Sequence, residues 1–225
     1  GRLSDDNSKA LIRELYANAI TLLSNNGNIL PLKTNKPLKV ATVAINKKES
    51  TIFQIRINSY YPAENFHVYT EDIKSVAEIS EKLRDFDIVI AAVYLNDQRP
   101  GRNFGIKPGM SGFVENLVSK NKTIVTFFGN PYALNNFEAL DRAESLILAY
   151  QENEFTDDLS AQLIFGGIGA KGRLPVTIND KWRVNHGITT IGNIRIQYGL
   201  PENAGMSTEI LNRKIDSVVK AGLLA

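Results

Sequence analysis

Five short and almost uninterrupted apolar runs constrain the fold of this chain more than any other feature. They lie at residues 39–45, 65–70, 87–95, 123–128 and 145–150. Such strands need cover on both faces, which is typical of parallel sheets. Helical spacing fills the intervals at 71–83, 111–119, 131–140 and 156–165. The alternation predicts an α/β fold, a three-layer sandwich in which a mostly parallel, doubly wound sheet of about six strands carries helices on both faces.

The segment before Tyr60 fits two patterns. Phe53, Ile55 and Ile57 alternate with polar residues as in a strand, whereas Arg56 and Tyr60 extend a helical stripe. Two parallel strands of one sheet need a crossover connection, and this segment lies between two of the apolar runs. We therefore predict a helix here.

The two ends of the chain have helical patterns of their own. Residues 10–23 repeat apolar side chains at helical spacing, Ser4–Asp6 offers capping oxygens, and 25–28 should end the helix. Beyond Gly172 the chain is rich in turns until Pro201, and an amphipathic helix begins near Ser207. We predict three parts: a leading helix and linker at 1–36, the sandwich at 37–203, and the start of a further linker or domain at 204–225.

Charge and cysteine content exclude several classes of function. The formal net charge is +2 and the basic residues are scattered, so nucleic acid and anionic membranes are not expected partners. The chain has no cysteine, which removes disulfides, thiolate nucleophiles and cysteine zinc sites together. No apolar run reaches membrane-spanning length, and the first residues do not resemble a signal peptide.

Three sequence motifs that often mark catalytic or binding sites lack the flanking elements or partner residues that such sites need. Gly167–Gly172 spells G-x-G-x-x-G, but a helix precedes it and an extended segment follows, the reverse of a dinucleotide site. Gly109–Gly112 is not a nucleophile elbow, and Ser111 is expected to cap the next helix. Of the two histidines, His67 lies in a strand pattern and His186 in a polar loop without a nearby carboxylate. We predict no metal, no cofactor and no catalytic triad.

The loop after the third apolar run has the composition of a carbohydrate-binding loop. Ligands of open parallel sheets gather beyond the carboxyl ends of the strands. Residues 96–105 supply amide, carboxylate and guanidinium groups for sugar hydroxyls, and Phe104 offers an apolar ring for sugar C–H groups. The same composition describes many solvated loops. The predicted substrate-binding residues are Asn96, Asp97, Arg99 and Arg102.

Several segments, in order, resemble the second domain of glycoside hydrolase family 3 enzymes. They are Ala19–Leu32, Gly129–Tyr132, Gly172–Thr177 and Tyr198–Leu200. The resemblance implies an α/β sandwich of flavodoxin-like winding that packs against an N-terminal (β/α)8 barrel. It also implies that the nucleophilic Asp lies on that barrel, whose Lys-His-Phe-Pro-Gly-His-type segment this chain lacks.

The resemblance also bears on the proton donor. In β-glucosidase members a Glu of the loop after the third strand is the general acid, but here that loop holds only Asp97. In the β-N-acetylglucosaminidase branch a His on the barrel does this work, and the missing Glu and the form of Gly129–Tyr132 favour that branch. This domain would then shape the cleft, with no catalytic residue of its own.

The tail from Met206 resembles the first helix of a serine β-lactamase-like domain, which some bacterial members carry after the sandwich. The resemblance further implies a bacterial protein of the periplasm or cell exterior, whose signal peptide lies outside this sequence. Two other hypotheses remain open. One is a stand-alone flavodoxin-like module that binds a sugar or nucleotide, and the other is a structural spacer between catalytic modules.

Overall fold

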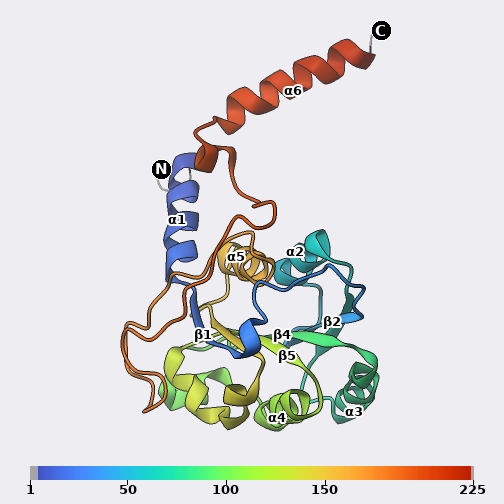
Figure 1. The fold of residues 1–225 in the computed structure, drawn as a ribbon, viewed down its shortest axis with the longest axis vertical. Helices are drawn as coiled ribbons and strands as arrows, with labels where there is room; N and C mark the ends of the chain where they lie inside the picture. The colour runs from blue at the N-terminus through green and yellow to red at the C-terminus, as the bar shows by residue number, and fades with distance from the viewer. Residues whose placement is uncertain (1–4, 224–225) are drawn as a thin grey trace.

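A six-stranded, mostly parallel sheet forms the centre of the computed structural model, which describes residues 5–223 (Figure 1). The strand order is β1-β6-β5-β4-β2-β3, and only the pairing of β1 with β6 is antiparallel. The strands are β1 (Thr21–Asn25), β2 (Val40–Ile45), β3 (Glu64–Val68), β4 (Ile88–Tyr94), β5 (Thr123–Phe128) and β6 (Ser145–Leu148). The predicted fold class is confirmed.

Helices cover both faces of the sheet. The α-helices are α1 (Asp6–Ala19), α2 (Ile52–Tyr60), α3 (Ile73–Lys82), α4 (Met110–Lys120), α5 (Glu154–Phe165) and α6 (Thr208–Leu223). The α2 and α5 helices lie on one face, whereas α3, α4 and the short helices after β5 lie on the other (Figure 1). Those short helices are η5 (Pro131–Asn136) and η6 (Glu138–Arg142), both 3-10, where the sequence predicted one continuous helix at 131–140.

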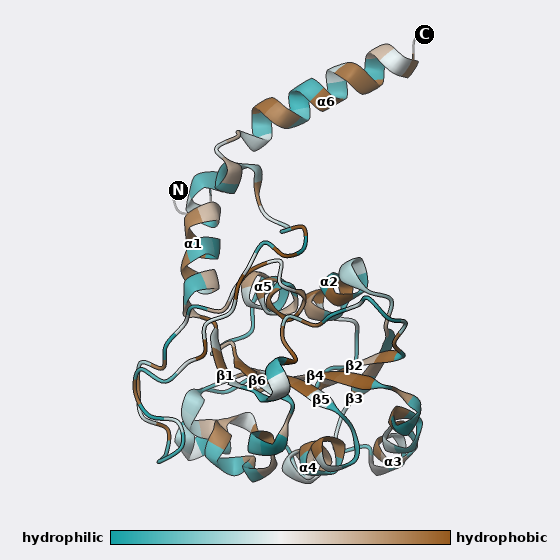
Figure 2. Ribbon diagram, in the orientation of Figure 1, coloured by the Kyte–Doolittle hydropathy of each residue, from teal (hydrophilic) through white to brown (hydrophobic). Residues whose placement is uncertain are grey.

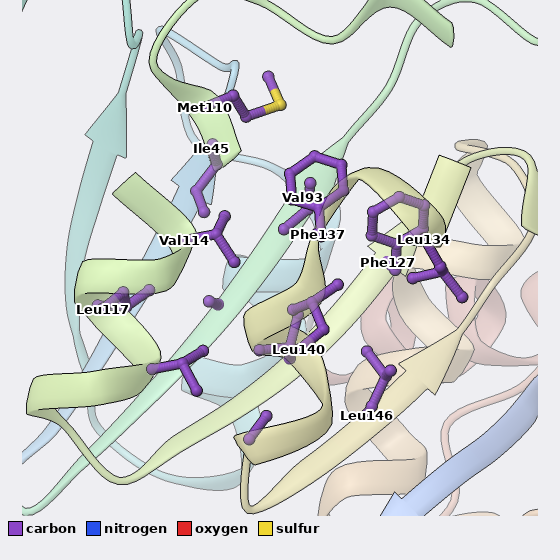
Figure 3. Packing of buried hydrophobic residues seen from close by; sticks show 14 of the residues in the cluster. Ile45, Val93, Met110, Val114, Leu117, Phe127, Leu134, Phe137, Leu140 and Leu146 are labelled. Atoms are coloured by element: carbon purple, nitrogen blue, oxygen red, sulfur yellow. The ribbon is translucent and has the colours of Figure 1, made fainter. Parts of the chain in front are cut away.

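The strands β2, β4, β5 and β6 are buried along their whole length and contribute to two separate cores, whereas the edge strand β3 contributes to one. In β4, Val89 and Val93 point into the core under α4, while Ile90 and Tyr94 point into the core under α2 and α5. Figure 3 shows the first core, where Val114 and Leu117 of α4 meet the sheet. Fully burying one such aliphatic side chain stabilises a fold by roughly 1.5–3 kcal/mol, so both layers are needed.

The segment with two possible patterns is a helix, as predicted. Thr51 caps α2, because its side chain accepts from the backbone N–H of Gln54 at 3.3 Å while the Gln54 side chain accepts from the Thr51 N–H. The buried Gln54 amide also donates to the Thr42 hydroxyl at 2.9 Å and to the Phe66 carbonyl at 3.2 Å. These bonds anchor α2 to β2 and β3.

The predicted helix at 10–23 is wrong in its last third. The α1 helix ends at Ala19, and Thr21–Asn25 forms β1 along the open edge of β6. Leu22 and Leu23 are both buried but belong to different cores, and only an extended backbone can send adjacent side chains to opposite faces. At the other end of α1 Asp5 caps the helix, accepting from the Ser8 N–H at 2.7 Å, while Ser4 lies outside the described residues.

The last fifty residues leave the sandwich in two steps. Residues 172–200 run over the surface with almost no regular structure, as predicted, and α6 then projects away from the domain (Figure 1). No residue of α6 is buried, although Ile215, Val218 and Val219 give it an apolar stripe (Figure 2). Among residues 5–223, no helix combines the length and the apolarity that crossing a membrane requires.

Candidate functional site

The loops that follow the five parallel strands meet at one edge of the sheet, here called the carboxyl edge. Side chains join these loops to one another. The Asn130 amide donates to the Gln98 carbonyl at 3.0 Å, and the Gln98 amide donates to the Tyr150 carbonyl at 3.4 Å. Lys47 and Glu152 form an ion pair at 2.5 Å. The loops after β2, β4, β5 and β6 therefore form one connected surface, where ligands of open α/β sheets bind.

The loop after β4 is organised around Asp97. Its two carboxylate oxygens accept from the Arg99 guanidinium, from Nε to Oδ1 at 2.9 Å and from NH2 to Oδ2 at 2.7 Å. The Arg99 backbone N–H also donates to Oδ1 at 2.9 Å, and Arg102 lies 3.7 Å from Oδ2. The guanidinium groups of Arg99 and Arg102 remain exposed to solvent. The structure thus brings three of the four predicted site residues together.

This geometry decides what Asp97 can do chemically. The hydrogen bonds from the Arg99 guanidinium and backbone hold the pKa of Asp97 well below its usual range, with Arg102 adding to the effect. The same contact raises the pKa of Arg99. Asp97 is therefore ionised at physiological pH and cannot donate a proton, so it accepts hydrogen bonds and orients Arg99.

The fourth predicted residue, Asn96, is exposed beside the same turn. Its side-chain oxygen lies against Gly105, which has a φ of 74°. A Cβ at Gly105 would clash with Asn96 and with the Asp97 backbone, so this left-handed position requires glycine. Asn96 is held at the base of the loop. Substrate binding by these four residues stays a prediction.

The expectation for Phe104 is wrong. The sequence suggested an exposed ring for sugar stacking, but Phe104 is buried and belongs to the core under α4. Asn103 and Phe104 both have positive φ, at 49° and 54°, and this left-handed turn sends the ring inward. Burial of the ring fastens the loop to the domain.

A second polar cluster on the carboxyl edge was missed by the sequence reasoning. Asp157, in the first turn of α5, is only 4% exposed, and its Oδ1 accepts from the Tyr94 hydroxyl at 3.2 Å. Burial and the nearby Glu152 raise the pKa of Asp157 to about 7, whereas Tyr94 and Lys47 act in the opposite direction. Burial also raises the pKa of Tyr94 well above its ordinary value.

The Lys47–Glu152 ion pair belongs to this second cluster. The Lys47 ammonium lies 4.8 Å from the centroid of the Tyr94 ring, and it faces a pocket that Glu152 and Asp157 also line. A carboxyl group with a pKa near 7 matches the proton affinity of a general acid, but burial holds Asp157 below the surface. The sequence signal for this cluster was the adjacent acidic pair Asp157 and Asp158, which precedes the more apolar second half of α5.

The remaining motifs have structural roles. His67 lies in β3 with its Nε2 3.0 Å from the Gln54 side-chain oxygen, and His186 Nε2 lies 2.8 Å from the Leu23 carbonyl oxygen. Gly166, with a φ of 77°, ends α5 before the glycine-rich turn, which agrees with the helix end inferred from the inverted motif. Asn130 caps η5 as the sequence suggested.

The predicted capping role of Ser111 is wrong. The N-cap of α4 is Gly109, which makes no side-chain capping bond. As for metal ligands, residues 5–223 contain no group of three or more His, Asp or Glu side chains placed to hold an ion.

Comparisons with known proteins agree with this fold. A protein of Formosa agariphila named "Putative beta-xylosidase" is 22% identical over 224 residues, covering 88% of this chain and 28% of that protein. A family 3 β-N-acetylglucosaminidase from Paenibacillus sp. str. FPU-7 superposes with a TM-score of 0.62 at 20% identity, covering 79% of this chain and 34% of that one. A β-glucosidase from Listeria innocua, solved with isofagomine, gives a TM-score of 0.62 at 15% identity, over 78% and 28% of the two chains.

The chain spans about a third or less of the length of each of these relatives. At 20% and 15% identity, the two solved structures show a shared fold alone. The family itself is shown by a direct sequence match, because residues 20–206 fit the family described as "Glycosyl hydrolase family 3 C-terminal domain". This chain therefore belongs to the C-terminal domain family of the family 3 glycosyl hydrolases.

Proposed function

We propose that this chain is the accessory domain of a glycoside hydrolase that cleaves terminal β-linked sugars. Retaining hydrolysis needs two carboxyl groups roughly 5 Å apart, one attacking and one protonating. Among the carboxyl groups of the described carboxyl edge, Asp97 is the ionised partner of Arg99, Glu152 is paired with Lys47 and Asp157 is buried. The observation that carries the proposal is the Asp97–Arg99 pair, which can bind and orient substrate but cannot supply a proton. The catalytic groups then belong to a (β/α)8 barrel outside this chain.

In this proposal the loop after β4 forms part of the rim of the barrel's cleft. Arg99 and Arg102 keep outward N–H groups that suit sugar hydroxyls, Asp97 fixes the direction of Arg99, and Asn96 adds an amide. The sugar is of N-acetylhexosamine or glucose type. The absence of a Glu from residues 96–105 supports the N-acetylglucosaminidase branch, in which the acid comes from the barrel.

The proposal extends to the surroundings of the domain. The apolar stripe of α6 has no partner within residues 5–223, which supports a further domain, such as a serine β-lactamase-like one, beyond it. The bacterial sources of the three relatives named above support a bacterial protein, and we propose that it acts in the periplasm or outside the cell.

A reconstitution experiment tests this function. The purified 225-residue chain should not hydrolyse aryl N-acetylglucosaminides, glucosides or xylosides, whereas a polypeptide that joins it to a family 3 barrel should. In that enzyme Arg99→Met should raise KM about tenfold with little change in kcat, because it removes one charged hydrogen bond to bound sugar.

Arg142→Met is the matched control, since Arg142 is equally exposed but pairs with Glu115 on the opposite side of the domain. Turnover by the isolated chain would overturn the proposal. Equal kinetics for Arg99→Met and wild type would contradict the assigned contact between Arg99 and the sugar.

A further inference from the structure

A second pocket on the carboxyl edge lies between the first turns of α2 and α5. Its volume is about 500 Å³, and its walls come from the loop after β2 and the loop after β6. It lies beyond the carboxyl ends of β2 and β6. Open α/β sheets bind their ligands beyond the carboxyl ends of their strands.

Charged donors and acceptors alternate around the pocket. Lys47 and Lys48 supply ammonium groups, and Glu49, Glu152 and Glu154 supply carboxylates. Lys47 is fixed from two sides, by Glu152 at 2.5 Å and by the Tyr94 ring at 4.8 Å. Each ammonium carries three donors and each carboxylate accepts along several directions, so this one contact leaves hydrogen-bonding capacity on both partners.

The polar groups at the floor of the pocket already have hydrogen-bond partners within the chain. Asn153 caps α5 by accepting from the N–H groups of Phe155 and Thr156, each at 3.0 Å, and Thr51 caps α2. The helix N-termini that meet here are thus occupied by their own caps. Asp157 lies beneath them, hydrogen-bonded to Tyr94.

These features narrow the class of ligand. Three carboxylates at the rim oppose an anion, and the described residues of the pocket contain no arrangement that could hold a metal ion. Ile52 is the one clearly apolar side chain among the lining residues, so an apolar ligand would gain little. A neutral molecule whose groups both donate and accept fits, and sugar hydroxyls do both.

We propose that this pocket binds one ring of a neutral carbohydrate, as a second sugar site beside the Asp97 loop. Lys47 would donate to one ring hydroxyl and Glu152 would accept from the adjacent hydroxyl. The ion pair would thus bind a vicinal diol of the sugar ring. The inference rests on the proposed function for its ligand class. It concerns binding by this chain alone, whereas the reconstitution experiment concerns catalysis with a barrel.

NMR titration of the 15N-labelled 225-residue chain tests the site. We expect N-acetylglucosamine, xylose or glucose, added to about 100 mM, to give saturable shifts of the backbone amides of residues 47–52 and 152–154. Lys47→Met and Glu152→Gln should each weaken binding about tenfold, the usual effect of losing a charge-assisted hydrogen bond. Lys122→Met, at the opposite edge of the sheet, should leave the affinity unchanged.

Two results would overturn the inference. One is the absence of saturable shifts at these amides for all three sugars. The other is binding that is lost in Arg99→Met but retained in Lys47→Met, because the sugar would then occupy the Asp97 loop alone. Sorbitol, an acyclic polyol, serves as a ligand control and should bind at least tenfold more weakly, since its hydroxyls are not held on a ring.

Discussion

Two aspartates of this chain each pair with two arginines, but in opposite surroundings. We call Asp158, Arg13 and Arg56 the inner cluster. Asp158 accepts from both arginines, its side chain is 8% exposed, and those of Arg13 and Arg56 are 9% and 24% exposed. The inner cluster joins α1, α2 and α5, and Arg13 also donates to the Tyr198 carbonyl at 2.6 Å. It fastens segments that are far apart in the sequence.

Asp97, Arg99 and Arg102 form the outer cluster. Asp97 is nearly as covered as Asp158, at 14% exposed, but the side chains of Arg99 and Arg102 are 61% and 67% exposed. All three residues belong to one loop. The comparison indicates that the surroundings of the arginines, more than those of the aspartate, separate a structural ion pair from one that is free to meet a ligand. Four experiments probe this difference.

The largest effect is expected from Asp158→Ala. Arg13 and Arg56 would lose their shared acceptor, and Arg13 is almost wholly buried. The free energy of unfolding should therefore fall by about 3–5 kcal/mol. Urea denaturation followed by circular dichroism measures the change. A loss of less than about 1 kcal/mol in the free energy of unfolding would mean that the inner cluster contributes no more than an ordinary surface ion pair. That result would contradict the structural role assigned to the inner cluster.

Asp157 extends the comparison to a buried aspartate with no arginine. Its pKa is raised to about 7 in the folded chain, against about 4 when unfolded, so the folded state binds the extra proton between these values. The free energy of unfolding should therefore fall as pH rises from about 4 to 7, and then level off. Asp157→Asn keeps the group neutral and should be more stable than wild type at pH 8 by roughly 2–4 kcal/mol.

The difference in free energy of unfolding between wild type and Asp157→Asn should vanish near pH 4. Because all other titrating groups are the same in both proteins, this comparison controls for them. Thermal unfolding at several pH values measures it. A constant difference across the range would show that Asn alters packing and leaves titration untouched.

Arg13→Met should have an intermediate effect. Asp158 would keep its bonds to Arg56 and to the Gln162 amide at 2.7 Å, so about 1–3 kcal/mol should be lost. Because Arg13 is the buried charged contact between α1 and the sandwich, amide exchange in α1 should accelerate more than exchange in β4. Uniform acceleration would mean that α1 is not held through Arg13.

The smallest effect on stability is expected from Asp97→Ala, because ion pairs whose arginines are exposed to solvent contribute little to stability. That effect should shrink further in 1 M NaCl, where screening is strong. A loss comparable to that of Asp158→Ala would mean that the outer cluster holds the fold and is not free for substrate.

The sequence predicted the parts of the fold that depend on local pattern. The apolar runs located β2 to β6, and the signal is strongest for β2, β4, β5 and β6, which are buried along their whole length. The run at 145–150 extends two residues beyond β6. The strand β1 was missed because Leu22 and Leu23 also suit a helix, and only the open edge of β6 decides between them. That edge is formed by residues more than a hundred positions away.

The candidate site divides in the same way. Asp97 and its arginines are neighbours in sequence, so their meeting was predictable. The hydrogen bond between Tyr94 and Asp157 joins residues 63 positions apart, so no local sequence pattern predicts it. Phe104 was misjudged because polar neighbours suggested exposure, whereas the left-handed turn that buries it is invisible in composition.

The strand β1 has a practical consequence for any attempt to produce this domain in shortened form. Its outer side is not bare, because the Ile188 N–H donates to the Leu22 carbonyl at 2.8 Å and ties the late surface segment to the early strand. A truncated protein that starts at residue 37 would lack β1. The backbone groups at the edge of β6 would then be unpaired and could form hydrogen bonds with a strand of another molecule. Self-association of such a protein would result from the removal of β1 and would not be a property of the intact domain.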